Sequence, residues 1–397
     1  MKFFFLFFLI PLLISCDKKN QINEQLYYVE DFRQPGMNDY QTIKAAYDSA
    51  PPNSKILFAN KTYIISHTLA LYKPLNFYGP AILKREDQIK YTLKEPADQN
   101  SSMLVLNNTD GIINGDIVII ANGQAYANTT GQNIVNNVSG DTLFLNYPIG
   151  QTFDNVSSFP VGTNLFKNIN FFGIVDPSLV PPYQGCGFIN FTFDGNRDNN
   201  NGTYAYNFNA AFLAPIKATT TFRYCTFINS PTETLIGHNM DIRNCIFNNL
   251  NGSALHTSID RQYCPESEIH TYLYNNIIEN TNQISTDIGG HSEGAITHSD
   301  SGGYYTAIGN TFINVGPSLL GGLYPSVSIH DWGTNNITFT RNTINGAGRI
   351  VRFVSMQPGI IHNVKIDSNI VTNMPAFDWT LELEYFPGII LEDKSGE

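Results

Sequence analysis

The chain has 397 residues, of which 42% are hydrophobic and only 14% are charged, and its formal net charge is −11. That apolar content is ample for a large buried core. The acidic balance argues against nucleic acid as a partner, although a local cluster of His and Arg can still bind an acidic polysaccharide. Asn, Thr, Ser, Gly and Tyr supply most of the polarity, which favours strands and tight turns over surface helices.

Residues 1–16 form a predicted export signal. A short basic start precedes an apolar run over residues 3–14, which is too short to favour a membrane-spanning helix. The run ends in Leu-Ile-Ser-Cys at Cys16 and resembles a bacterial lipoprotein signal, whose Cys becomes the lipidated first residue. We therefore expect an exported lipoprotein that is anchored to the outer membrane only through Cys16, with a tether at 17–27. An ordinary secretory signal is the alternative.

The predicted domain, residues 28–397, begins with a loop that contains Gly and Asp and leads into a short amphipathic helix. The helix carries apolar residues at helical spacing, namely Ile43, Ala46, Tyr47 and Ala50. Residues 31–50, with the strand-forming residues 55–66 after them, resemble the first segment of the pectate-lyase-like superfamily. The resemblance implies a β-helix capped by this helix. It implies little about chemistry, because the superfamily includes lyases, hydrolases, epimerases and phage tailspikes.

Residues 101–155 interrupt this organisation. Alternating strand patterns at 115–120 and 141–146 are separated by turns rich in Asn and Gly. We expect a small β insert between the early coils of the solenoid.

A repeated segment predicts the main solenoid, over residues 156–375. The segment has Asn or Cys, one further residue and then a large apolar residue, and it recurs at intervals of 20, 31, 34, 32 and 27 residues. A repeat of this length is typical of a solenoid. Asn side chains are expected to hydrogen-bond along the stack, with the apolar residues inside it. The repeat positions are Cys225, Cys245, Asn276, Asn310, Asn342 and Asn369.

These patterns predict an all-β fold, a right-handed parallel β-helix solenoid with a short N-terminal cap helix, a small β insert and a C-terminal cap at about 376–397. Cys225 and Cys245 share one repeat position, so we expect buried stacked thiols there instead of a disulfide. No cofactor is predicted, because neither a zinc-site spacing nor a calcium-binding Asp cluster stands out. Nothing in the sequence indicates an oligomeric state.

Four strands that precede the repeated segments carry the candidate catalytic groups. His256, Thr297 or His298, His330 and Arg352 fall at about the same point of these strands. Neighbouring strands lie about 4.8 Å apart, so such a column would span about 15 Å, enough for two or three sugar units. The inward or outward phase is open, because a one-residue slip reverses each side chain. Ordinary structural roles for single His residues are the alternative.

A polysaccharide lyase requires a cation beside the uronate carboxylate, a base for the C5 proton and an acid for the leaving oxygen. Arg352 could supply the cation, one of the three His residues the base, and Tyr304 or Tyr305 the acid. Sugar-binding roles are expected for Tyr304, Tyr305, Trp332 and Arg349.

A glycoside hydrolase instead requires two carboxylates at a set separation. Glu293, Asp300 and Asp331 are the candidates. The paired Asp motif of the superfamily's polygalacturonases is absent, which disfavours hydrolysis. The interpretation is therefore an envelope protein that acts on a polysaccharide, as a lyase first and a glycoside hydrolase second. A non-catalytic glycan-binding lipoprotein and a structural β-helix protein are the alternatives.

Overall fold

The computed structural model describes most of the strand-forming chain. The described residues are 25–121, 133–149, 158–173, 185–200, 212–213, 219–231, 234–237, 239–257, 270–281, 295–298, 304–315, 330–331, 336–346, 351–354, 363–373 and 381–384. The predicted signal with Cys16, most of the tether, and the candidates Glu293, Asp300, Trp332 and Arg349 lie outside them.

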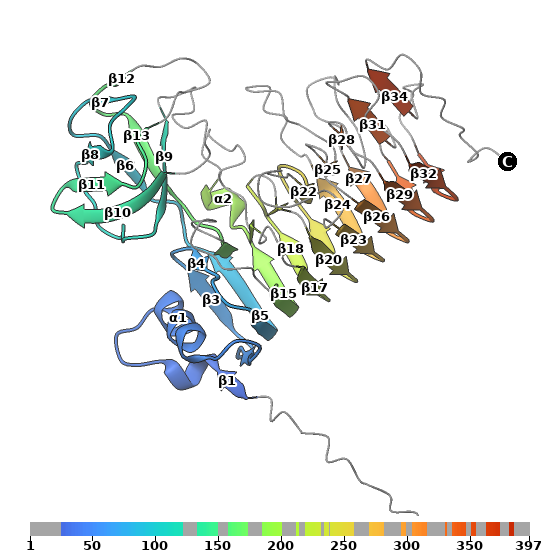
Figure 1. Ribbon diagram of the computed structural model, residues 1–397, viewed down its shortest axis with the longest axis horizontal. Coiled ribbons are helices and arrows are strands. Elements are labelled where there is room, and N and C mark those ends of the chain that lie inside the picture. The colour runs from blue at the N-terminus through green and yellow to red at the C-terminus, as the bar shows by residue number, and fades with distance from the viewer. Residues whose placement is uncertain are drawn as a thin grey trace, which may run out of the picture.

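Three ladders of parallel strands run along the molecule (Figure 1). The first ladder contains β17 (Thr220–Arg223), β20 (Met240–Arg243), β23 (His270–Tyr274), β26 (Tyr304–Ile308), β29 (Ile337–Thr340) and β32 (Val364–Asp367). The second contains β18 (Thr226–Ile228), β21 (Ile246–Asn248), β24 (Ile277–Thr281), β27 (Thr311–Val315), β30 (Thr343–Asn345) and β33 (Ile370–Thr372). The third is a separate seven-stranded sheet of β16 (Phe212–Leu213), β19 (Leu235–Ile236), β22 (Leu255–Thr257), β25 (Ile296–His298), β28 (His330–Asp331), β31 (Val351–Val354) and β34 (Leu381–Glu384).

Each coil of the chain contributes one strand to each ladder, which makes the fold a parallel β-helix. The predicted all-β class and solenoid are therefore confirmed. The inward residues of the three ladders form one continuous core, in which aromatic rings of successive coils stack. Phe193, Phe227 and Phe247 are one such stack, with ring centroids 4.9 and 4.6 Å apart.

The repeated Asn residues lie at the corner between the first two ladders. Asn276 donates a side-chain hydrogen bond to Asn310, Asn310 donates to Asn342, and Asn342 donates to Asn369, at 2.9–3.1 Å. We call this row the Asn column. The residue before each member has a positive φ, which lets the chain turn sharply, and Asn275 and Gly309 are residues that tolerate this conformation. The predicted stacking of these side chains is confirmed.

The two repeat positions occupied by Cys continue the Asn column. The backbone N–H of Cys225 donates to the sulfur of Cys245 at 3.4 Å, and the N–H of Cys245 donates to the Asn276 side chain. The two thiols are not joined in a disulfide and both are buried, as is the thiol of Cys186. The expectation of stacked thiols in place of a disulfide is thus confirmed for this pair.

The N-terminal coils begin with β1 (Leu26–Tyr28), so the β-helix starts two residues before the predicted boundary at 28. A 3-10 helix, η1 (Val29–Phe32), and the cap helix α1 (Asp39–Ser49) follow. A capping box between Asn38 and Gln41 starts α1, and the predicted apolar stripe of the helix is buried. The remaining early strands are β2 (Lys55–Leu57), β3 (Thr62–Ile65), β4 (Leu69–Ala70), β5 (Asn76–Arg85), β14 (Phe172–Gly173) and β15 (Gly187–Asp194), and α2 (Arg197–Asn200) comes next.

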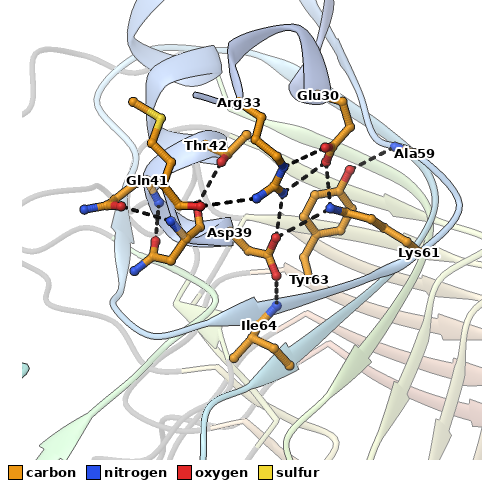
Figure 2. Close-up of polar contacts among 11 residues, drawn as sticks. Glu30, Arg33, Asp39, Gln41, Thr42, Ala59, Lys61, Tyr63 and Ile64 are labelled. Carbon is orange, nitrogen blue, oxygen red and sulfur yellow. Dashed lines mark hydrogen bonds and ion pairs between the residues drawn. The ribbon is translucent and has the colours of Figure 1, made fainter. Parts of the chain in front are cut away.

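A charged cluster fastens α1 to the first coil (Figure 2). The Arg33 guanidinium donates to Glu30 at 2.7 Å and to Asp39 at 2.6 Å. The Lys61 ammonium lies 2.9 Å from Glu30. The second oxygen of Asp39 accepts from the N–H of Ile64 in β3, at 2.8 Å. Helix, 3-10 turn and strand are therefore joined through the same carboxylates.

The insert is larger than predicted. Its six-stranded sheet consists of β6 (Lys90–Thr92), β8 (Met103–Val105), β9 (Ile117–Ala121), β10 (Asn133–Ser139), β11 (Thr142–Leu145) and β13 (Asn164–Asn168). It therefore spans residues 90–168 instead of 101–155, and the short pair β7 (Ala97–Asp98) and β12 (Ser158–Phe159) lies within the same stretch. The sheet has its own apolar core, and Figure 1 shows it beside the N-terminal coils. No helix in the described part of the chain is long and apolar enough to cross a membrane.

Candidate active site

The register of the third ladder aligns the predicted column. His256 in β22 pairs with Thr297 in β25, Thr297 with His330 in β28, and His330 with Arg352 in β31. We call these positions the His–Arg row. At about 4.8 Å a step, the row spans about 15 Å from first strand to last. The register therefore brings together, at the level of the backbone, groups that lie almost a hundred residues apart in the sequence.

Burial on the first strands of the ladder locates the core position that precedes this row. Leu235 and Leu255 are completely buried in the core, and Ile296 occupies the same position one strand further on. Ile236 is half-buried, whereas all three residues of β22, including His256 at 9% exposed, are buried. The His–Arg row continues the position of Ile236 and His256 across the ladder.

The open choice between Thr297 and His298 is decided by the register in favour of Thr297. His298 pairs with Thr257 and with Asp331, one position further along the strands. Successive residues of a strand alternate between its two faces, so this neighbouring row and the His–Arg row belong to opposite faces of the sheet. His298 and Asp331 therefore belong to a different row from His330 and Arg352.

One residue of the row was not singled out from the sequence. Glu382 in β34 pairs with Arg352 and extends the row by one strand. The alternation of Leu and Glu in this segment indicates a strand, but the alternation alone does not show which row the strand joins. The interval from Arg352 to Glu382 is 30 residues, close to the length of the preceding coils, and that spacing could have placed Glu382 in the row.

The prediction that Tyr305 contacts a sugar is wrong. The Tyr305 side chain is completely buried in the solenoid core, and burial raises the pKa of its hydroxyl far above the ordinary value. Tyr304 is 39% exposed. It lies in β26 of the first ladder, however, and its ring stacks on that of His270 at 4.7 Å. An acid role beside the His–Arg row is therefore not supported for either Tyr.

A cavity of about 200 Å³ lies at the other end of the molecule, between α1 and the insert. The polar groups that line it are already engaged: Asp116 binds His67 at 2.8 Å, and the Tyr47 hydroxyl accepts from the N–H groups of Tyr72 and Lys73. The described residues contain no group of three or more His, Cys, Asp or Glu side chains arranged to hold a metal ion.

No protein-family model matches the chain, and no curated protein matches it. The solved structures similar to it are parallel β-helix proteins. The family 28 exopolygalacturonase of Yersinia enterocolitica is 13% identical, with a TM-score of 0.45 over 91% of this chain and 68% of that one. XylC, solved with xylose, is 10% identical, with a TM-score of 0.42 over 87% and 70%. A glycoside hydrolase is 9% identical, with a TM-score of 0.33 over 90% and 89%.

Proposed function

We propose that this protein cleaves an acidic polysaccharide by β-elimination, in a groove over the third ladder. The observation that carries the proposal is the register of the His–Arg row, which places His330, Arg352 and Glu382 at consecutive strand positions. An imidazole, a guanidinium and a carboxylate would thus follow one another along the row. The step between neighbouring groups, about 4.8 Å, is close to the length of one sugar unit with its linkage. The predicted signal at 1–16 would direct the enzyme to the envelope, where such polymers occur.

Each group in the row has a distinct task in elimination. The Arg352 guanidinium would pair with the uronate carboxylate and so make the neighbouring C5 proton more acidic. Neutral His330 would take that proton. The electron pair of the C5–H bond then forms the C4–C5 double bond, while the C4–O bond breaks and its oxygen receives a proton from water. The hydroxide formed in this way takes the C5 proton from the His330 imidazolium, which restores the neutral imidazole. Glu382, one strand further on, would hold Arg352 in position.

Hydrolysis is less well supported by the same register. Retaining and inverting glycosidases require a pair of carboxyl groups. Among the described positions of the His–Arg row, Glu382 is the one carboxylate, and Asp331 belongs to the neighbouring row. Glu293 and Asp300, the other candidates, lie outside the described residues.

The experiment is a screen of the purified protein on polygalacturonate, alginate and xylan. Unsaturated uronate ends would be followed by their ultraviolet absorbance, beside a count of all reducing ends. We expect both signals to rise together on an acidic polymer. His330→Ala should lower kcat by about 100-fold or more, the usual contribution of a general base. Arg352→Ala should do likewise, whereas Lys94→Ala, an exposed cation in the insert, should have no effect.

Two outcomes would contradict the proposal of elimination. New reducing ends without the absorbance would replace elimination by hydrolysis. Retained binding without any new ends would instead support the alternative of a glycan-binding protein.

A further inference from the structure

Aromatic rings cover part of the outer surface of the first ladder, away from the His–Arg row. His270, Tyr272 and Tyr274 alternate along β23 with Thr271 and Leu273, which are buried in the solenoid. The three rings are nearly parallel, with centroids 5.9 and 6.1 Å apart and interplanar angles of 7° and 14°. They therefore form a row of parallel rings on the outer side of one strand.

The rings extend onto the next coil and are accessible. Tyr304 pairs with His270 in register, stacks on its ring at 4.7 Å and is 39% exposed. The side chains of Tyr272 and Tyr274 are half-buried. Beyond Tyr272 the register continues with Thr306 and then with Thr338, neither of which is aromatic.

Positive charge accompanies these rings. The Arg243 guanidinium lies 4.7 Å from the centre of the Tyr274 ring. Asp241 accepts hydrogen bonds from both Arg243 and Arg223, so one carboxylate is shared by two guanidinium groups. The cluster has a net charge of +1 on a chain of −11, and Arg243 keeps 44% of its side chain exposed. The local charge thus favours an anionic ligand, in contrast to the chain as a whole.

We propose that His270, Tyr272, Tyr274, Tyr304 and Arg243 form a second binding surface, here called the aromatic face, which holds a chain of an acidic polysaccharide. The flat apolar sides of sugar rings pack on aromatic rings, and a guanidinium binds a uronate carboxylate through two hydrogen bonds. The choice of a saccharide rests on the proposed function, whereas the location rests on the contacts above. Such a surface would keep the protein on its polymer between cleavage events.

The rings also stack on one another, so their contribution to stability must be separated from binding. The experiment is affinity electrophoresis in gels that contain polygalacturonate, alginate or xylan, with the thermal midpoint of each variant measured in parallel. Tyr272→Ala combined with Tyr274→Ala should weaken retention by an acidic polymer about tenfold, the effect of losing two aromatic contacts. Tyr147→Ala, which removes a 50% exposed Tyr from the insert, is the matched control and should bind like the wild type.

Two further variants identify the chemistry of binding. Tyr272→Phe keeps the ring and should keep the affinity. Arg243→Gln should weaken retention by polygalacturonate or alginate and leave any retention by unsubstituted xylan unchanged, because the unsubstituted polymer offers no carboxylate.

The inference is overturned if the wild type is retained by none of the three polymers, or if the double Tyr variant is retained as strongly as the wild type. It is supported if His330→Ala abolishes cleavage while retention persists. Retention through the aromatic face without cleavage of any polymer would contradict the proposed function and leave this inference standing.

Discussion

Single residues at the N-terminal end make the stability of the cap dependent on pH. The hydrogen bond from Arg33, with a smaller contribution from Lys61, lowers the pKa of Glu30 from 4.5 to about 2. A carboxyl group whose pKa is lower in the folded state stabilises the fold above the unfolded value of 4.5, and that contribution is lost as the pH falls towards 2. The Glu30 side chain is 35% exposed, so solvent screens much of the effect.

We therefore expect Glu30→Gln to lower the free energy of unfolding by about 1 kcal/mol at pH 7 and by less at pH 3. Urea unfolding of both proteins at the two pH values measures the difference. Asp31→Asn, which changes the exposed neighbouring carboxylate, is the control and should show no such pH-dependent difference. A Glu30→Gln deficit that stays constant between pH 7 and pH 3 would contradict the assignment.

At the scale of elements, the Asn column is what holds successive coils at the corner. Asn310 is completely buried, accepts hydrogen bonds from the backbone and side chain of Asn276, and donates to the Leu273 carbonyl and to Asn342. Asn310→Ala would leave several of these buried groups without partners. We expect a loss of about 3 kcal/mol in the free energy of unfolding, measured by guanidinium denaturation.

Two substitutions test whether the column itself is responsible. Asn369→Ala acts at the partly exposed end of the column and should cost less than Asn310→Ala. Asn310→Cys should also cost less, since Cys245 already occupies an equivalent position and its sulfur accepts a backbone hydrogen bond. If all three substitutions lowered the free energy of unfolding equally, the hydrogen bonds of the Asn column would not be the source of the stability.

The same elements show why some features were predictable and others were not. The Asn column could be predicted because Asn recurs at the repeat interval and because its side chain can hydrogen-bond to the next Asn along the stack. Tyr304 and Tyr305 could not be told apart, because adjacent residues of a strand face opposite ways and a Tyr suits either side. Glu382 was missed because only strand pairing across 30 residues shows which positions share a row.

At the scale of the whole molecule, the described residues form two separate apolar cores, one in the solenoid and one in the insert. The sequence predicted the insert but not its true limits, because β6 and β13 are ordinary apolar strands until their pairing is known. Polar contacts connect the two parts: His67 of the early coils binds Asp116 of the insert at 2.8 Å in a buried pair, and buried Lys167 lies 3.5 Å from half-buried Glu86.

Two separate apolar cores should lose stability separately. Leu143 is completely buried in the insert, and Leu143→Ala should lower its local stability by about 2–5 kcal/mol through the cavity left behind. Hydrogen exchange should then speed up in β8, β10 and β11, while peptides from the coils after β17 keep the wild-type rate. Ile278→Ala, at a completely buried position of the solenoid core, should give the reverse pattern. Faster exchange throughout the chain in the Leu143→Ala protein would instead mean that the insert and the solenoid unfold as one unit.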